Sequence, residues 1–141
     1  MRPDIVPPPL GRAAREPDTH APDGSEIRLL ATEVHGATRA SLCEVRLRAG
    51  TVSRPVRHRS IEEIWHVTAG RGRVWRCPPG RDAQPVDVTV GDTLVIPRGW
   101  DFQFSAALDT DLRFLCYASP SWPGADEAES AEPGALGTPT I

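Results

Sequence analysis

The sequence predicts an all-β protein, and three observations support this prediction. Apolar and polar residues alternate with a period of two in short runs such as residues 42–48, which is the pattern of strands with one buried face. Glycine and proline interrupt the chain about every ten residues, a spacing typical of the turns in a sandwich or barrel. No segment shows the period of 3.6 residues that marks an amphipathic helix.

The first three predicted strands lie in the middle of the chain. Residues 42–48 alternate apolar and charged side chains and stop at Gly50. Residues 63–67 are rich in β-branched and aromatic side chains, which favour strands, and the turn after them ends at Gly72. The third strand, 73–76, follows this turn, so the second and third runs are predicted to form a hairpin.

The later predicted strands are short and closely spaced. Residues 86–90 alternate cleanly before Gly91, and residues 93–96 end at Pro97, which cannot continue a strand ladder. Two further runs complete the set, residues 102–104 and 112–117.

The chain is predicted to contain one folded domain between two flexible arms. Residues 1–21 hold five prolines among charged and small residues, so they bury too little apolar surface to offset the cost of ordering. Residues 123–141 are acidic and small, which predicts a second flexible arm. The barrel is therefore expected over residues 22–122.

Composition limits the class of protein. The chain has 141 residues, of which 39% are apolar and 25% charged, as in one soluble domain. It lacks the apolar stretch of a membrane span or secretory signal, so a cytoplasmic protein is expected. A net charge of −3 without a basic run predicts neither a nucleic-acid nor a membrane partner. Of the three cysteines, Cys43 and Cys116 lie in apolar runs and are predicted to be core residues.

Two segments match the motifs of a known family. In the first, His58 precedes Glu63 by the required spacing, with six residues between Glu63 and Gly70. The second runs from Gly91 through Pro97 to Gly99. These segments resemble the two motifs of the cupin family, and the resemblance covers most of residues 40–118. It implies a double-stranded β-helix, the jelly-roll barrel, with a small-molecule pocket inside.

The sequence departs from the family pattern at two positions. Val56 stands at the first histidine position and Phe102 at the histidine of the second motif. The resemblance implies three histidines and one glutamate that hold iron, manganese, nickel, copper or zinc, and only His58 and Glu63 are kept. Two protein ligands weaken metal binding sharply. We therefore expect either one divalent metal (Fe, Mn, Ni, Cu or Zn), with Asp101 as a third ligand, or no metal.

The strand register near residue 101 decides what faces the pocket. With Phe102 and Phe104 inward the pocket is apolar, and hydrophobicity favours this reading. With Asp101 and Gln103 inward, after a one-residue bulge, the pocket is polar and a metal site is completed.

Alternation selects further residues for the pocket wall. Trp65 lies two residues after Glu63 and so shares its face, whereas His66 faces away. Trp75 on the next strand, Tyr117 and Val56 are further candidates for contacts with a ligand.

Two functions follow from the resemblance and from His58 and Glu63. The first is a small-molecule enzyme of isomerase, cyclase, lyase or oxygenase type, in which these two residues bind a metal or act as acid and base. The second is a non-catalytic module that holds an apolar or aromatic ligand without metal. The resemblance also covers sugar-phosphate isomerases and enzymes of specialised metabolism, and it implies a homodimer.

Overall fold

The structure, a computed structural model, describes residues 4–141 and confirms the all-β prediction. No helix in this part of the chain is long and apolar enough to cross a membrane. Two short 3-10 helices, η1 and η2, accompany eleven strands. The elements are β1 (Thr19–His20), β2 (Glu26–Ala31), η1 (Glu33–His35), β3 (Ser41–Leu47), β4 (Val56–His58), β5 (Glu62–Ala69), β6 (Arg71–Cys77), β7 (Val86–Thr89), β8 (Thr93–Ile96), β9 (Asp101–Ala106), β10 (Leu112–Ser119), η2 (Ala125–Glu127) and β11 (Ala128–Ser130).

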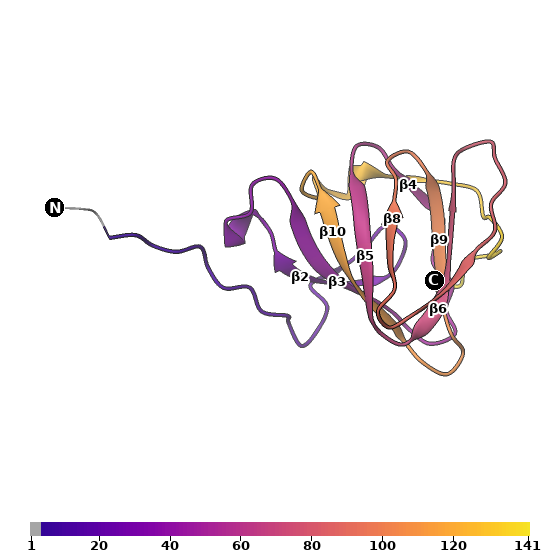
Figure 1. Cartoon of the computed structure of the whole chain (residues 1–141), viewed down its shortest axis with the longest axis horizontal. Coiled ribbons are helices and arrows are strands. Elements are labelled where there is room, and N and C mark those ends of the chain that lie inside the picture. The colour runs from indigo at the N-terminus through magenta and orange to yellow at the C-terminus, as the bar shows by residue number, and fades with distance from the viewer. Residues whose placement is uncertain (1–3) are drawn as a thin grey trace.

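The strands form two antiparallel sheets that face each other as a jelly roll. One sheet has six strands in the order β1-β2-β3-β10-β5-β8, and the other has five in the order β11-β4-β9-β6-β7. Figure 1 shows β10, β5 and β8 side by side in the first sheet, with β4 and β9 of the other sheet to their right. Strands that are consecutive in sequence often lie in different sheets, so the chain crosses the core repeatedly.

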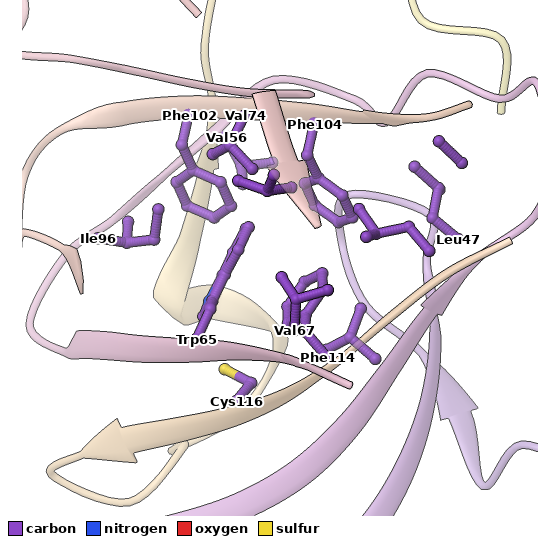
Figure 2. Close-up of a cluster of buried hydrophobic side chains, with 14 residues drawn as sticks. Leu47, Val56, Trp65, Val67, Val74, Ile96, Phe102, Phe104, Phe114 and Cys116 are labelled. Atoms are coloured by element: carbon purple, nitrogen blue, oxygen red, sulfur yellow. The ribbon is translucent and has the colours of Figure 1, made fainter. Parts of the chain in front are cut away.

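The core between the sheets is built from the inward faces predicted by alternation. Trp65 stacks on Phe114 with ring centroids 4.2 Å apart, and Phe104 meets both rings edge-on. Figure 2 shows these rings with Phe102 and Ile96 in the space between the two sheets. Paired aromatic rings add stabilisation beyond the area they bury, so this cluster holds the two sheets together.

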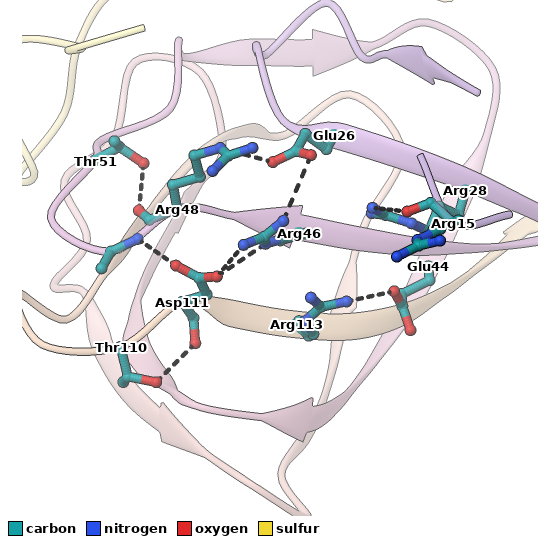
Figure 3. A network of polar contacts seen from close by, with 11 residues as sticks. Arg15, Glu26, Arg28, Glu44, Arg46, Arg48, Thr51, Thr110, Asp111 and Arg113 are labelled. Carbon is teal, nitrogen blue, oxygen red and sulfur yellow. Dashed lines mark hydrogen bonds and ion pairs between the residues drawn. The ribbon is translucent and has the colours of Figure 1, made fainter. Parts of the chain in front are cut away.

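A network of ion pairs lies on the outer face of the six-stranded sheet, drawn in Figure 3. Arg46 on β3 contacts Asp111 at 2.6 Å and Glu26 on β2 at 3.8 Å. Asp111 also accepts a hydrogen bond from the Ala49 backbone at 2.8 Å, and these bonds lower its pKa. The network links three neighbouring strands and fixes the turn before β10.

The N-terminal segment differs in part from the predicted arm. Residues 4–14 contain no strand or helix, and Figure 1 shows the chain running away from the barrel toward its N-terminal end. The barrel nevertheless begins before residue 22, because β1 pairs with β2. Arg28 on β2 also donates hydrogen bonds to the carbonyl oxygens of Ala14 and Arg15, at 3.0 and 3.1 Å.

The C-terminal segment was expected to be a flexible arm, and the structure corrects this expectation. β11 pairs antiparallel with β4 and extends the five-stranded sheet. Farther along, the Thr140 backbone N–H donates to the carbonyl oxygen of Val52, and the Val52 N–H donates to the Thr140 hydroxyl. Gln103 also donates to the carbonyl oxygen of Gly137 at 2.8 Å. The prediction from composition was wrong because a polar segment can be ordered without burying many apolar side chains. The edge of an existing sheet supplies it with backbone hydrogen bonds.

The packing of this segment on β6 can be tested at Gly134. A methyl group at Gly134 would overlap the indole ring of Trp75, so one of the two would have to shift. We expect Gly134→Ala to lower the free energy of unfolding by about 1–3 kcal/mol, because the ring or the segment must move. The matched control is Ala135→Ser, which alters an exposed neighbour. Urea denaturation measures both, and equal stabilities would show that the segment does not pack on Trp75.

Candidate functional site

The fold brings His58 and Glu63 together at one end of the core. β4 ends on His58, a turn follows, and β5 presents Glu63 on its inward face. Both side chains are buried, and Nε2 of His58 lies 3.9 Å from Oε2 of Glu63. This distance is longer than a hydrogen bond, so the two side chains are not hydrogen-bonded to each other.

Glu63 sits in surroundings that favour its neutral form. Burial raises the pKa of the Glu63 carboxyl to about 7, although hydrogen bonds from Trp65 and Cys116 act in the opposite direction. The Trp65 indole Nε1 donates to Glu63 Oε1 at 2.9 Å. Below pH 7 Glu63 is therefore mostly protonated and can act as a proton donor.

His58 is also held in its neutral form. Burial lowers the pKa of the imidazole to about 4, although the negative charge of Glu127 acts in the opposite direction. The ring lies edge-on to Phe102 and Trp122, with centroids 4.9 and 5.5 Å away. Its Nδ1 is buried without a hydrogen-bond partner. An unpaired polar atom in an apolar site is costly, so this nitrogen is a candidate for contact with a ligand.

A small cavity lies beside the two residues. Its volume is about 30 Å³, which is room for about two water molecules. Trp122 lines this cavity and is 36% exposed, so this residue reaches from the cavity to the protein surface. The lining residues include two carboxyl groups, one imidazole and no lysine or arginine: Ala21, Pro22, Asp23, Val45, Val56, His58, Glu63, Trp65, Phe114, Cys116, Trp122 and Ala128.

Asp23 is a site residue that the sequence analysis missed. It is buried at the cavity, and its Oδ1 accepts hydrogen bonds from the Ser25 backbone and hydroxyl at 2.9 and 2.6 Å. Burial raises the pKa of Asp23, against these hydrogen bonds. The sequence Asp23-Gly24-Ser25 signals a turn, but nothing in it indicates that the turn folds over the mouth of a barrel.

Glu127 is the second residue that was missed. It belongs to η2, inside the segment expected to be flexible. Its Oε1 accepts the backbone N–H groups of Ser60 and Ile61 at 2.5 and 2.7 Å, and its Oε2 accepts the Ser60 hydroxyl at 2.7 Å. Burial raises the pKa of Glu127, but these hydrogen bonds outweigh it and the net shift is downward. The carboxylate therefore fixes the turn between His58 and Glu63.

The residues around position 102 divide between two faces. Val56 and Phe102 are Cα partners, and both are buried in the core, as is Phe104. Asp101 lies on the other face, where its carboxylate accepts a hydrogen bond from Arg57 at 2.8 Å. Gln103 is buried on that face too, beneath the C-terminal segment.

Asp101 is therefore not a metal ligand beside His58 and Glu63, and Gln103 does not face the pocket. The pairing of β9 with β4 and β6 continues without the bulge that would turn Asp101 inward. Burying two phenylalanine rings favours this register over burying a carboxylate.

Two aromatic candidates for the pocket wall lie elsewhere. The Trp75 ring is on the face of β6 away from the core, under Gly134, where Nε1 donates to the carbonyl oxygen of Ala83 at 3.2 Å. Tyr117 points outward from β10 and is 43% exposed. Strand alternation explains both corrections, because Val74 and Cys116 take the inward positions beside them.

The donor set does not fit a divalent metal. Hydrocarbon side chains, Val56 and Phe102, occupy two of the four positions that the family resemblance assigns to ligands. Within residues 4–141, no group of three or more His, Cys, Asp or Glu side chains is placed to hold a metal ion. His58 and Glu63 alone would supply two protein ligands, fewer than the three or four that hold zinc in proteins.

Comparison with known proteins supports the fold. No protein-family model matches the chain. An uncharacterized protein of Methanocaldococcus jannaschii is 29% identical over 101 residues, which are 71% of this chain and 77% of that protein.

Solved structures with cupin-type folds also resemble the chain. Oxalate decarboxylase from Bacillus subtilis has a TM-score of 0.73 and 15% identity over 90% of this chain, which spans only 33% of that longer chain. The polyketide cyclase RemF from Streptomyces resistomycificus has a TM-score of 0.65 and 23% identity, over 96% of this chain and 89% of the other. The fold is therefore a cupin-type jelly roll.

Proposed function

We propose that the protein is a small-molecule enzyme that transfers protons without a bound metal, of isomerase or cyclase type. His58 is the proton acceptor and Glu63 the proton donor. The observation that carries this proposal is the reversed order of their pKa values. In water the imidazole binds a proton more tightly than the carboxyl, whereas here the pKa of His58 is about 4 and that of Glu63 about 7.

The reversed order gives each residue the form that proton transfer requires. Between pH 4 and 7 the proton resides on Glu63, and the imidazole of His58 has a free lone pair. A carbonyl compound bound between them would lose an α-proton to His58 while Glu63 protonates its oxygen, which yields an enol. Returning the proton at the same or another carbon completes an exchange or an isomerisation, and the proton count balances.

The charge of the cavity defines the substrate class. Asp23 and Glu63 line it, while the two arginines that flank His58 pair with other carboxylates: Arg57 with Asp101 and Glu129, and Arg59 with Glu129. A dicarboxylate such as oxalate would enter without a positive partner, at a large desolvation cost. We therefore expect an uncharged, largely apolar substrate. Because the cavity has room for only about two water molecules, the Trp122 ring must move aside to admit it.

This proposal is tested by hydrogen–deuterium exchange at carbon. The protein is incubated in D₂O with small uncharged ketones such as cyclohexanone, and NMR follows the loss of α-protons. We expect exchange above the buffer rate, and about a 10²–10⁴-fold loss in His58→Gln and in Glu63→Gln. The matched control is His66→Gln, because His66 lies on the outer face of β5.

Three results would contradict the proposal. One is exchange at the buffer rate with every ketone, and another is an unchanged rate in His58→Gln. The third is a rate that appears only after a divalent metal is added.

A non-catalytic binding module is the second candidate, favoured by the apolar lining of the cavity. It predicts that uncharged aromatic compounds raise the melting temperature without any exchange at carbon. This stabilisation would survive a chelator.

Formation of a homodimer by two copies of this chain remains a prediction. An exposed apolar row crosses the outer face of the six-stranded sheet, where Tyr117 pairs with Ile64 and Ile64 with Val95. Such a row is the kind of surface that a homodimer covers.

A further inference from the structure

Two cysteines stand directly opposite each other beside the cavity. Cys43 on β3 and Cys116 on β10 are Cα partners in the antiparallel ladder. Both side chains point inward, since they share the faces of Val45 and Phe114. Opposite residues in such a ladder have Cα atoms about 4.5–5.5 Å apart, within the range that a disulfide bridges.

The two thiols differ in exposure. Cys116 is buried and lines the cavity, where its thiol contacts both Cys43 and Glu63. Cys43 is only partly buried, so a small oxidant can reach it. The contact with Cys43 and burial raise the pKa of Cys116, and Cys43 is therefore the thiol that reacts first.

The third cysteine provides a contrast. Cys77 is buried at the end of β6 in the other sheet, and its thiol is engaged with the carbonyl oxygen of Arg81 at 2.8 Å. It has no cysteine opposite it, because its partner on β9 is Asp101.

We propose that Cys43 and Cys116 form an oxidation site, in which a peroxide converts the two thiols to an interstrand disulfide. The proposal does not depend on the proton-transfer function. The Cys43 thiolate attacks a peroxide oxygen and becomes a sulfenic acid, and the displaced hydroxide takes up a proton to form water. The Cys116 sulfur then attacks the Cys43 sulfur, and the hydroxyl leaves with the Cys116 proton as a second water.

The disulfide would alter the neighbouring carboxyl. In the reduced protein the neighbouring Cys116 thiol lowers the pKa of Glu63. A disulfide has no S–H group to direct at the carboxyl, so this effect is lost on oxidation. Oxidation is thus coupled to the proton donor of the site.

The test treats the native full-length chain with hydrogen peroxide, blocks remaining thiols under denaturing conditions, and maps peptides by mass spectrometry. We expect a peptide containing Cys43 joined to one containing Cys116, with the loss of two hydrogen atoms and full reversal by dithiothreitol. The joined peptide should persist in Cys77→Ser and disappear in Cys43→Ser. Because Cys43 is partly exposed, Cys43→Ser is expected to fold, and circular dichroism checks this.

Several results would overturn the proposal. They are sulfinic acid at Cys43 without a joined peptide, two unmodified thiols after prolonged treatment, or a link that involves Cys77 or a second chain. A joined peptide that forms only in denatured protein would also overturn it, because the proposal rests on the native register of β3 and β10.

Discussion

Glu63→Gln is expected to raise the free energy of unfolding above pH 7 by about 3 kcal/mol, because the folded protein no longer has to bury a carboxylate. The glutamine keeps an oxygen that can accept the hydrogen bond from Trp65. A substitution in the candidate site that stabilises the protein is the expected signature of a residue kept for function at the expense of stability.

The pH dependence follows from the directions of the two pKa shifts. The pKa of Glu63 is raised from 4.5 to about 7, so its contribution to stability is complete below pH 4.5 and is lost as the pH rises through 7. The pKa of His58 is lowered from 6.5 to about 4, so its contribution is complete above pH 6.5 and is lost as the pH falls through 4. Between pH 4.5 and 6.5, rising pH lowers the contribution of Glu63 to stability and raises that of His58.

Substituting either residue should therefore reveal the pH dependence of stability that the other residue contributes. Urea denaturation between pH 4.5 and 6.5 compares each variant with the unsubstituted chain, because Asp23, whose pKa is also raised by burial, adds the same pH dependence to all of them. Relative to the unsubstituted chain, Glu63→Gln should gain stability as the pH rises and His58→Gln should lose it, each by about 3 kcal/mol over the full titration. Glu62→Gln, at the exposed neighbour on β5, is the control. Profiles parallel to that of the unsubstituted chain in both site variants would mean that burial perturbs neither group.

Glu127→Ala is expected to lower the free energy of unfolding by about 3–5 kcal/mol, the larger of the two effects. The substitution removes the acceptor for two backbone N–H groups and one hydroxyl in the turn at Ser60 and Ile61. Hydrogen bonds to a charged acceptor are worth about 1.5–3 kcal/mol each, and buried donors left without an acceptor add to the loss.

A control variant and the pH dependence separate the hydrogen-bonding role of Glu127 from the mere loss of a negative charge. Glu129→Ala, two residues further on, removes an exposed partner of Arg57 and Arg59 and should cost less than about 1 kcal/mol. The pKa of Glu127 is lowered, so its contribution is present above pH 4.5 and is lost as the pH falls below that value. Equal losses in the two variants, or a Glu127→Ala effect that persists in acid, would contradict the assigned contacts.

Much of the barrel could be predicted from the sequence because the two-residue alternation of the strands and the positions of their apolar side chains indicate the same buried face. Along β5 the alternation placed Glu63 and Trp65 on one face and His66 on the other, and the structure has the same pattern. At β9 the hydrophobicity of Phe102 and Phe104 decided the register in the expected sense. Both predictions rest on local information, namely which residues of one strand share a face.

The remainder depends on contacts between distant segments. Trp75 was expected at the pocket because it is aromatic, yet it is buried by the C-terminal segment on the opposite face. Glu127 lies in an acidic stretch where no local feature separates a buried carboxylate from solvated ones. Asp23 enters the cavity only because β1 and β2 bring their connecting turn across its mouth. Neither the alternation of residues along a strand nor the composition of a segment shows which distant segment will pack against it.

The pairing of β11 with β4 has a consequence for how the protein is made. As the chain leaves the ribosome, β4 is present long before Ala128–Ser130, the residues that cover its outer edge. Until they emerge, the strand that carries His58 has an open edge that another nascent chain could pair with. Assembly of the site is therefore a late event of synthesis, and slow release or truncation near residue 127 would favour aggregation over a partly active barrel.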